Sequence, residues 1–251
     1  MIVYLYDGSF EGLLTAIYQA YYQKQKPDQI LHQQEFEPSL FCQPFFIETD
    51  PVKFQKVYKA IAEKISTNAL NNVFYAFLSE TQGVGTLIYH YLRLGWQKGG
   101  EIDGHLSDQR VMEIQRLVQK VAGERHRMLG LLRFKELKGG LYYASFEPDY
   151  NIVALMAPHF TKRLSDQNWI IHDWKRKLAA LYNRQEWLVT PLDPPKEVLL
   201  EENEGFFQDL WCQYFSSVAI SGRINPRLQR QYMPVRYWRH LIEKGPENKK
   251  A

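Results

Sequence analysis

The stretch at residues 128–147, MLGLLRFKELKGGLYYASFE, decides the fold class of the second half of this chain. Two β-prone runs, 128–137 and 141–147, flank Lys138-Gly139-Gly140, and glycines supply the positive φ angles that tight hairpin turns need. A helical segment follows at 151–164, where Pro158 either kinks the helix or marks its start, and further β-prone runs lie at 169–173, 178–183 and 186–189. The order β-β-α-β-β-β predicts an antiparallel sheet with a helix across one face.

The first half of the chain predicts helices around one early strand. Residues 2–6 are β-rich, and the following Asp7-Gly8-Ser9 indicates a tight turn and a capped helix. Four helical segments follow at 52–65, 69–80, 84–97 and 106–125, and residues 43–49 are a candidate for a second short strand. The expected fold is therefore α+β, with a mainly helical region at 1–125, a sheet at 126–190 and a helical basic segment at 196–243. That last segment is either separate or part of one compact unit with 126–190, and residues 246–251 are expected to be mobile.

Composition limits the possible classes of protein. A chain of 251 residues that is 45% hydrophobic can bury a sizeable core. The net charge is +3, but residues 1–125 carry 12 basic and 14 acidic groups, whereas residues 126–251 carry 19 and 14. The second half is therefore the better candidate for contact with a polyanion.

Cysteine usage and hydropathy add two expectations. Cys42 and Cys212 are far apart in apolar surroundings, which is typical of buried thiols in a reducing compartment. Two cysteines cannot build a four-cysteine zinc site or a cluster held by three cysteines, so we expect no metal and no cofactor in this chain alone. The short apolar run at residues 2–6 fits neither a signal peptide nor a membrane span, so a cytoplasmic location without membrane contact is expected.

The C-terminal segment 206–241, FFQDLWCQYFSSVAISGRINPRLQRQYMPVRYWRHL, is the strongest candidate for a functional surface. No acidic residue occurs between Asp209 and Glu243, and five arginines do: Arg223, Arg227, Arg230, Arg236 and Arg239. Apolar residues recur at helical spacing (Phe207, Leu210, Trp211, Tyr214 and Val218), and this stripe is expected to dock on the rest of the protein. Asn225-Pro226 predicts a new short helix, and Pro234 predicts another short turn.

Arginines without local carboxylates favour an external anion, and a planar guanidinium fits a phosphate through two hydrogen bonds. Tyr237 and Trp238 lie among these arginines and are candidates for stacking on unpaired bases. The basic turn Lys175, Arg176 and Lys177 extends the candidate phosphate-binding set. The alternative is that the arginines pair with the acidic run just upstream (Glu197, Glu201, Glu202, Glu204 and Asp209) while the aromatic residues fill the core.

Catalytic candidates are few, because the chain has no phosphate loop, nucleophile elbow or metal-binding motif. Asp7 at the end of a first strand either activates water or fixes the turn. His159 and Arg163 are four residues apart and share one helical face, where they either hold an anion or serve as structural residues. His172 and Asp173 are adjacent on a strand and so point to opposite faces, which makes any partner of Asp173 come from another element.

Three blocks of the sequence resemble a known bacterial family. They are YDGSFEGLLTAIYQAYYQK at the start, RFKELKGGLYYASFEPDYNIVALMAPHFTKRLSDQNWIIHD in the middle and WCQYFSSVAISGRINPRLQRQYMPVRYWRHLIE at the end. The chain resembles probable DNA metabolism proteins, whose middle and last blocks are a domain of unknown function also found joined to uracil-DNA glycosylase-like domains. Members are typically encoded beside a putative DNA-modification or repair protein of the radical SAM class.

The resemblance implies a DNA-binding accessory or adaptor protein in DNA repair or modification. DNA and the radical SAM protein are its expected partners, and that partner would carry the iron-sulfur cluster and S-adenosylmethionine. Two alternatives stay open: a nucleic-acid-processing enzyme such as a glycosylase-like hydrolase, and a structural partner of the radical SAM protein without DNA contact. Turnover, and therefore enzymatic activity, is undecided by the sequence.

Overall fold

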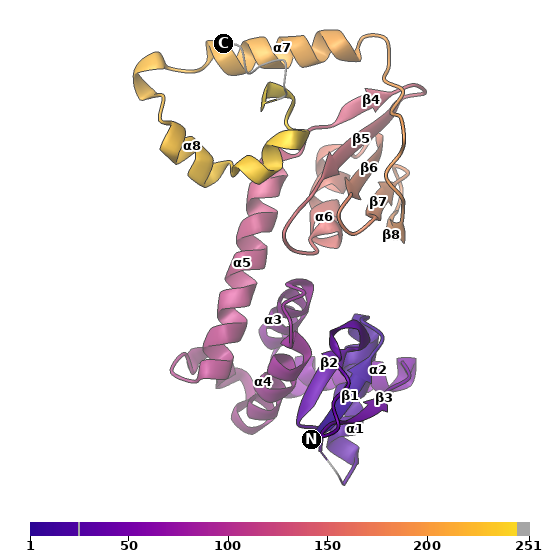
Figure 1. Ribbon diagram of the computed structural model, residues 1–251. Coiled ribbons are helices and arrows are strands. Elements are labelled where there is room, and N and C mark those ends of the chain that lie inside the picture. The colour runs from indigo at the N-terminus through magenta and orange to yellow at the C-terminus, as the bar shows by residue number, and fades with distance from the viewer. Residues whose placement is uncertain (25, 245–251) are drawn as a thin grey trace. The chain divides into compact units, whose positions relative to one another are not determined.

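The computed structural model describes residues 1–24 and 26–244, and the chain divides into an N-terminal unit, residues 1–122, and a C-terminal unit, residues 123–251 (Figure 1). The fold is α+β, as the sequence predicts. The end expected to be mobile, 246–251, lies outside the described residues.

The N-terminal unit contains a parallel sheet in the order β2-β1-β3, formed by β1 (Ile2–Tyr6), β2 (Gln29–His32) and β3 (Gln43–Phe46). The sequence predicts one early strand and therefore underestimates the number of strands in this unit. The candidate strand at 43–49 exists as β3, whereas β2 was not predicted. The four residues of β2 show no two-residue periodicity, since Ile30 and Leu31 are adjacent apolar residues between Gln29 and His32.

Helices pack against this sheet and against one another: α1 (Phe10–Tyr22), α2 (Pro51–Lys64), α3 (Thr67–Leu78) and α4 (Val84–Lys98), with short 3-10 turns η1 (Gln33–Glu35) and η2 (Gly99–Gly104). Local chemistry sets their starts. Ser9 Oγ accepts the backbone N–H of Gly12 at 2.9 Å, and the Asp50 carboxylate accepts the N–H groups of Val52 and Lys53. The core of the unit includes Tyr4 and Tyr6 of β1 among many aliphatic side chains.

Helix α5 (Gln109–Leu131) spans the boundary between the units, so the hairpin predicted from residue 128 begins later. Its strands are β4 (Lys135–Leu137) and β5 (Leu141–Phe146). Gly139 and Gly140 have φ angles of 91° and 75°, which confirms the predicted glycine turn.

The C-terminal unit has a five-stranded sheet in the order β4-β5-β6-β7-β8. Helix α6 (Val153–Arg163) follows β5 and leads to β6 (Asn168–Asp173), β7 (Leu178–Tyr182) and β8 (Trp187–Pro191). The predicted β-β-α-β-β-β order is confirmed, but the sheet is mixed because β5 and β6 are parallel. The reason is the crossover: a chain that returns through a helix re-enters the sheet in its original direction.

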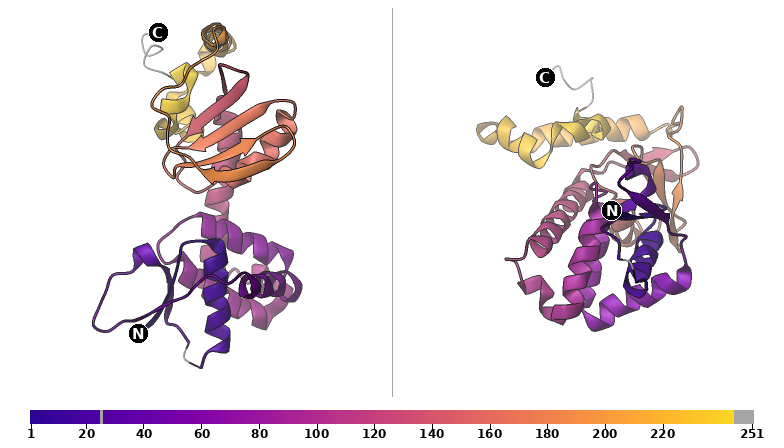
Figure 2. Two further views of the ribbon diagram at one scale, coloured as in Figure 1. Left: turned by 90° about the vertical axis from the view of Figure 1, so that its right-hand side faces the viewer. Right: turned by 60° about the horizontal axis from the view of Figure 1, so that its bottom comes forward.

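Helix α6 covers one face of this sheet and contacts β6, β7 and β8 (Figure 2). The remaining elements are α7 (Glu204–Ser217), η3 (Ser221–Arg223), α8 (Pro226–Tyr232), η4 (Val235–His240) and η5 (Ile242–Lys244). In Figure 1 these elements form an arc beside the sheet, with α7 contacting β4 and η4 contacting β5.

Within the described residues, no helix combines the length and the apolar character that crossing a membrane requires.

Candidate nucleic-acid interface

Helix α7 turns a different face inward from the one that the sequence predicts. Of the stripe that was expected to dock, Phe207, Leu210, Tyr214 and Val218 are between 49% and 56% exposed. The better buried positions are Glu204, Gln208, Trp211, Cys212 and Phe215. The prediction of a docked apolar stripe is therefore wrong for all of its members except Trp211.

Polar anchors explain which face of α7 is turned inward. The indole N–H of Trp211 donates to Glu243 Oε2 at 3.0 Å, and Arg133 donates to the two oxygens of the same carboxylate at 2.6 and 3.2 Å. The Arg133 guanidinium also lies 4.9 Å from the centre of the Trp211 ring. At the start of the helix, the Glu204 carboxylate accepts the backbone N–H of Glu136 at 2.9 Å. These contacts fix the rotation of α7 and leave its apolar stripe in solvent.

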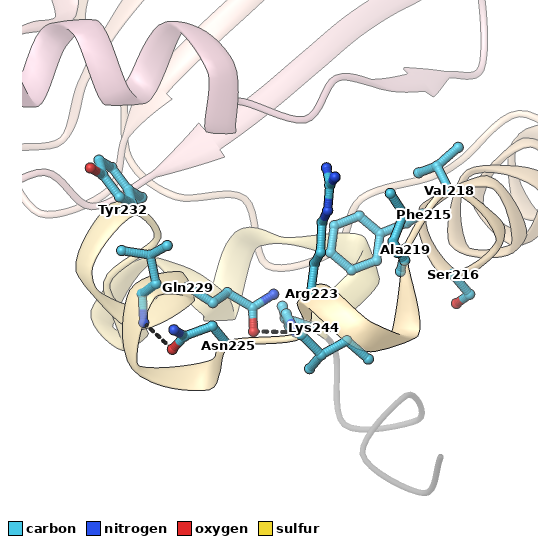
Figure 3. A pocket seen from close by; sticks show the side chains of 12 residues that line it. Phe215, Ser216, Val218, Ala219, Arg223, Asn225, Gln229, Tyr232 and Lys244 are labelled. Carbon is cyan, nitrogen blue, oxygen red and sulfur yellow. Dashed lines mark hydrogen bonds between the residues drawn. The ribbon is translucent and has the colours of Figure 1, made fainter.

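An open groove lies between the end of α7 and α8 (Figure 3). Its volume is about 690 Å³. Apolar side chains dominate its lining: Phe215, Val218, Ala219, Ile220, Ile224, Leu228 and Tyr232. The polar lining residues are Arg223, Lys244, Ser216, Asn225 and Gln229, so both charges in the groove are positive and no carboxylate lines it.

Helix α8 presents two different faces. Its start is set by Asn225, whose side chain accepts the N–H of Leu228 at 3.0 Å, and by Pro226 at the first helical position, as predicted. Leu228 and Tyr232 line the groove. Arg227 and Arg230 do not, because successive residues rotate by about 100° around a helix and these two therefore lie on the opposite side.

Three of the five arginines keep their charge available. Arg223, Arg227 and Arg230 are exposed, and no ion pair to any of them occurs within residues 1–24 and 26–244. The Nε–H of Arg230 donates to the Pro226 carbonyl at 3.1 Å, which holds the side chain along the helix and leaves its terminal nitrogens for other acceptors. This part of the predicted phosphate-binding set is open to an external anion.

The other two arginines already have partners. Arg236 pairs with Asp149 at 2.8 Å and Arg239 pairs with Glu147 at 3.2 Å. Neither partner belongs to the acidic run at 197–209 that the sequence offered as the alternative. Both pairs are substantially exposed to solvent, with 48% of the Arg236 side chain and 65% of the Arg239 side chain accessible, so each is a weak interaction.

The aromatic residues predicted to stack on bases are used inside the protein. Tyr237 is 4% exposed, and its hydroxyl donates to the buried carboxylate of Glu124. Burial and that carboxylate raise the pKa of Tyr237. The Trp238 indole donates to the Met233 carbonyl at 2.9 Å and its ring lies under Lys244. Among the aromatic residues that lie between Arg223 and Arg239, the exposed one is Tyr232, which is 66% accessible and lines the groove.

The basic turn between β6 and β7 is mostly neutralised. Arg176 is nearly buried, pairs with Asp173 at 2.9 Å and donates to the Asp149 carbonyl at 2.7 Å. Lys177 pairs with Asp193 at 2.8 Å, and Lys175 approaches the Asp149 carbonyl at 3.4 Å. Arg176 is thus a structural residue, and the groove beside Arg223 does not include the turn.

Comparison with known families places this geometry in context. Residues 82–243 match the family model described as a domain of unknown function, DUF4130. The chain belongs to this family. No curated protein matches the chain. The DUF4130 region contains the whole arginine segment, the five-stranded sheet and every groove-lining residue except Lys244, and it leaves out the first 81 residues.

Asp7, which precedes the DUF4130 region, has both of its carboxylate oxygens occupied. Oδ1 accepts the N–H and the hydroxyl of Ser9 at 2.9 and 2.6 Å, and Oδ2 accepts the hydroxyl of Thr49 at 2.8 Å. Although burial alone would raise its pKa, these hydrogen bonds hold the pKa of Asp7 below its usual value. The contacts favour the turn-fixing role over the catalytic one.

Asp173 and His172, inside the DUF4130 region, are fully buried. Asp173 accepts the N–H groups of Lys175 and Arg176 and pairs with the Arg176 side chain, while burial raises its pKa. His172 contacts the Tyr143 hydroxyl at 2.8 Å through Nδ1 and donates from Nε2 to the Leu192 carbonyl at 2.9 Å. Neither side chain reaches a surface where a substrate could bind.

His159 and Arg163 of the DUF4130 helix α6 give no sign of a built anion site. His159 is half-buried with its ring against Phe160, and Arg163 is exposed at the end of the helix. Within the described residues, no group of three or more histidine, cysteine or acidic side chains is placed to hold a metal ion.

Sequence reasoning missed a polar relay between η4 and β5. Ser145 Oγ lies 3.0 Å from His240 Nδ1, and His240 Nε2 lies 3.1 Å from Glu147 Oε2. Burial of the ring lowers the pKa of His240, although the Glu147 carboxylate opposes that effect. Since Ser145 and His240 are 95 residues apart, no local sequence signal could have found the relay.

Proposed function

We propose that this protein is a nucleic-acid-binding accessory protein, and that DNA is its natural polyanion. The observation that carries the proposal is the set of exposed arginines, Arg223, Arg227 and Arg230, without a carboxylate partner in the described part of the chain. They lie in a segment without any acidic residue from 210 to 242. Phosphate groups supply the missing negative charge, and release of counterions from the polymer makes such binding favourable at low salt.

Arg227 and Arg230 form the centre of the proposed contact. They project from the side of α8 away from the groove, so a phosphate backbone reaches them without displacing another part of the unit. Arg236 and Arg239 extend the positive surface but contribute less, because each is already paired with a carboxylate. Contacts of this kind position a backbone and do not distinguish bases, so we expect little dependence on sequence.

The proposed mode differs from the one that the sequence suggested in its use of aromatic residues. Tyr237 and Trp238 are held by hydrogen bonds within the unit and do not present an open ring face for stacking. We therefore expect duplex and single-stranded DNA to bind with similar affinity. The hydrolase alternative receives less support, because Asp173 is buried and Asp7 is held by Ser9 and Thr49.

A more specific role for the protein follows from its resemblance to a known family. The probable DNA metabolism proteins that this chain resembles are typically encoded beside a radical SAM protein of DNA modification or repair. We propose that the chain binds DNA on behalf of such a partner. The two cysteines of this chain cannot hold a cluster that needs three, so the iron-sulfur cluster and the S-adenosylmethionine would belong to the partner.

The test is a fluorescence anisotropy titration of the full chain with labelled single-stranded and duplex DNA at several salt concentrations. The variant Arg227→Gln/Arg230→Gln is compared with Arg116→Gln/Lys120→Gln on α5, which removes the same charge from exposed positions outside the segment. We expect the first variant to lose about tenfold or more in affinity with a shallower salt dependence, and the second to change little. Equal losses in both variants, or no DNA binding at low salt, would overturn the proposal.

A further inference from the structure

The C-terminal arc exposes an unusual amount of apolar surface. Ten large hydrophobic side chains between residues 206 and 235 are at least 47% exposed: Phe206, Phe207, Leu210, Tyr214, Val218, Ile220, Ile224, Leu228, Tyr232 and Val235. Soluble monomers rarely expose contiguous apolar patches above a few hundred Å², and larger ones mark interaction sites. Five of these side chains converge on the groove between α7 and α8.

The groove has the properties of a site for a helix. Its lining comes from the end of α7, from the connection at 218–225 and from the inner face of α8, with Lys244 added from η5, so an apolar ridge can be held by more than one segment (Figure 3). Aliphatic side chains such as Val218, Ile220 and Ile224 make up most of the apolar lining. Aliphatic surfaces pack against leucine-like ridges of an amphipathic helix, whereas nucleic-acid bases stack on aromatic rings.

Charge selects among possible helices. The charged groups lining the groove are Arg223 and Lys244, with no carboxylate among the lining residues. We infer that the groove binds an amphipathic α-helix of a partner protein, with the apolar stripe of that helix on Val218, Ile224 and Leu228 and with acidic side chains beside Arg223 and Lys244. The electrostatic match favours acidic helices over basic ones and speeds their encounter.

Three other occupants fit less well. The last seven residues of the chain, GPENKKA, contain no large apolar side chain and so have nothing to fill the groove. In a symmetric dimer, each copy would bring Arg223 and Lys244 toward the same positive groove, so self-association is electrostatically unfavourable. A membrane surface needs protruding apolar side chains, whereas the apolar side chains of the groove line a concavity.

This inference does not depend on nucleic-acid binding. Of the three arginines proposed to bind phosphate, Arg223 lines the groove, whereas Arg227 and Arg230 do not. The centre of the proposed phosphate contact and the proposed helix contact therefore use opposite sides of α8. The two interactions can therefore be separated by substitution.

The probe is a fluorescein-labelled amphipathic peptide of about 18 residues, with leucines at helical spacing flanked by glutamates. Two control peptides have lysine in place of glutamate, or the same composition in an order that destroys the stripe. Anisotropy titrations with the full chain should show binding of the acidic amphipathic peptide at least tenfold tighter than either control. Hydrogen exchange should then show added protection in α7 and α8.

The decisive variant is Ile224→Asp, which places a carboxylate in the groove at a side chain that is 66% exposed, so the fold is not disturbed. Ile224→Ser tests the apolar contribution alone, and Val52→Ser on the N-terminal unit, 63% exposed, is the matched control. We expect peptide-binding losses of about tenfold or more for both Ile224 variants and none for Val52→Ser, with DNA binding unchanged in Ile224→Ser and Val52→Ser.

Several results would overturn the inference. One is that the scrambled acidic peptide binds as tightly as the amphipathic one, and another is that the acidic amphipathic peptide does not bind. A third is that anionic phospholipid vesicles compete with the peptide in the unsubstituted protein but not in Ile224→Asp. A fourth is that the chain forms concentration-dependent dimers that Ile224→Asp abolishes. Loss of peptide binding with DNA binding intact supports the groove. Loss of DNA binding in Arg227→Gln/Arg230→Gln with peptide binding intact supports the separate phosphate face.

Discussion

The Glu243 carboxylate anchors helix α7 through hydrogen bonds, and its replacement gives the sharpest test of how the C-terminal elements from α7 to η5 are held. Glu243 is 6% exposed, and its carboxylate receives three hydrogen bonds from other residues, two from Arg133 and one from the Trp211 indole. Burial alone would raise the pKa of Glu243, but the bonds from Arg133, from its own backbone and from Trp211 bring that pKa below its usual value, so the group is ionised at neutral pH.

The cost of Glu243→Gln follows from the partner that remains. Only 14% of the Arg133 side chain is accessible, so its charge would stay largely buried without a counter-ion. Removing one partner of a buried ion pair costs about 3–5 kcal/mol, and the glutamine oxygen keeps at most part of the hydrogen bonding. We expect the C-terminal unit to lose about 3 kcal/mol of unfolding free energy.

Urea unfolding followed by tryptophan fluorescence measures the loss, and hydrogen exchange locates it in α7. The double variant Arg133→Met/Glu243→Met should recover much of the stability, because it removes both charges together. A loss below about 0.5 kcal/mol in Glu243→Gln, within the range of ordinary surface substitutions, would refute the claim that this pair anchors the helix.

Three further outcomes follow from other contacts. Gly140→Ala, at φ 75° in open space, should cost about 1 kcal/mol by urea unfolding, whereas Gly130→Ala within α5 should be neutral or stabilising. Because burial lowers the pKa of His240, the unfolded chain binds more protons below about pH 6.5, so the C-terminal unit should lose stability from neutral pH towards pH 5, and His240→Gln should flatten that slope. Asp7→Asn should cost the N-terminal unit about 1–2 kcal/mol, since an amide nitrogen cannot accept the hydrogen bonds of Ser9 and Thr49; an unchanged melting temperature would contradict that role.

Local signals in the sequence predicted local structure well. The glycine turn at 139–140, the Asn225-Pro226 helix start and the β-β-α-β-β-β order each depend on residues within a few positions of one another, and all are confirmed. Predicting the direction of β6 relative to β5 requires one further inference, because strands joined by a helical crossover are expected to pair in parallel. Strand β2 was missed because it pairs with β1 without any periodic pattern of its own.

Contacts between distant parts of the sequence could not be predicted. Arg239 is 92 residues from Glu147, and Arg133 is 110 residues from Glu243. The sequence therefore suggested nearby carboxylates for the arginines and missed the ones that pair. For the same reason the prediction of which face of α7 is buried was wrong. Hydrophobic periodicity indicated one apolar stripe, but the hydrogen bonds of Glu204 and Glu243 hold the helix in a different rotation.

The absence of acidic residues from 210 to 242 has a physical consequence that the two proposed contacts share. A carboxylate on either side of the short helix α8 would lie close to both surfaces, because only one helix diameter separates them. It would weaken a phosphate at Arg227 and repel an acidic helix at Arg223 at the same time. An acid placed at Gln231, which is exposed and does not line the groove, should therefore weaken DNA binding and peptide binding together at low salt, whereas Gln231→Asn should weaken neither. Weakening of only one of them by Gln231→Glu would show that the two contacts do not share this electrostatic field.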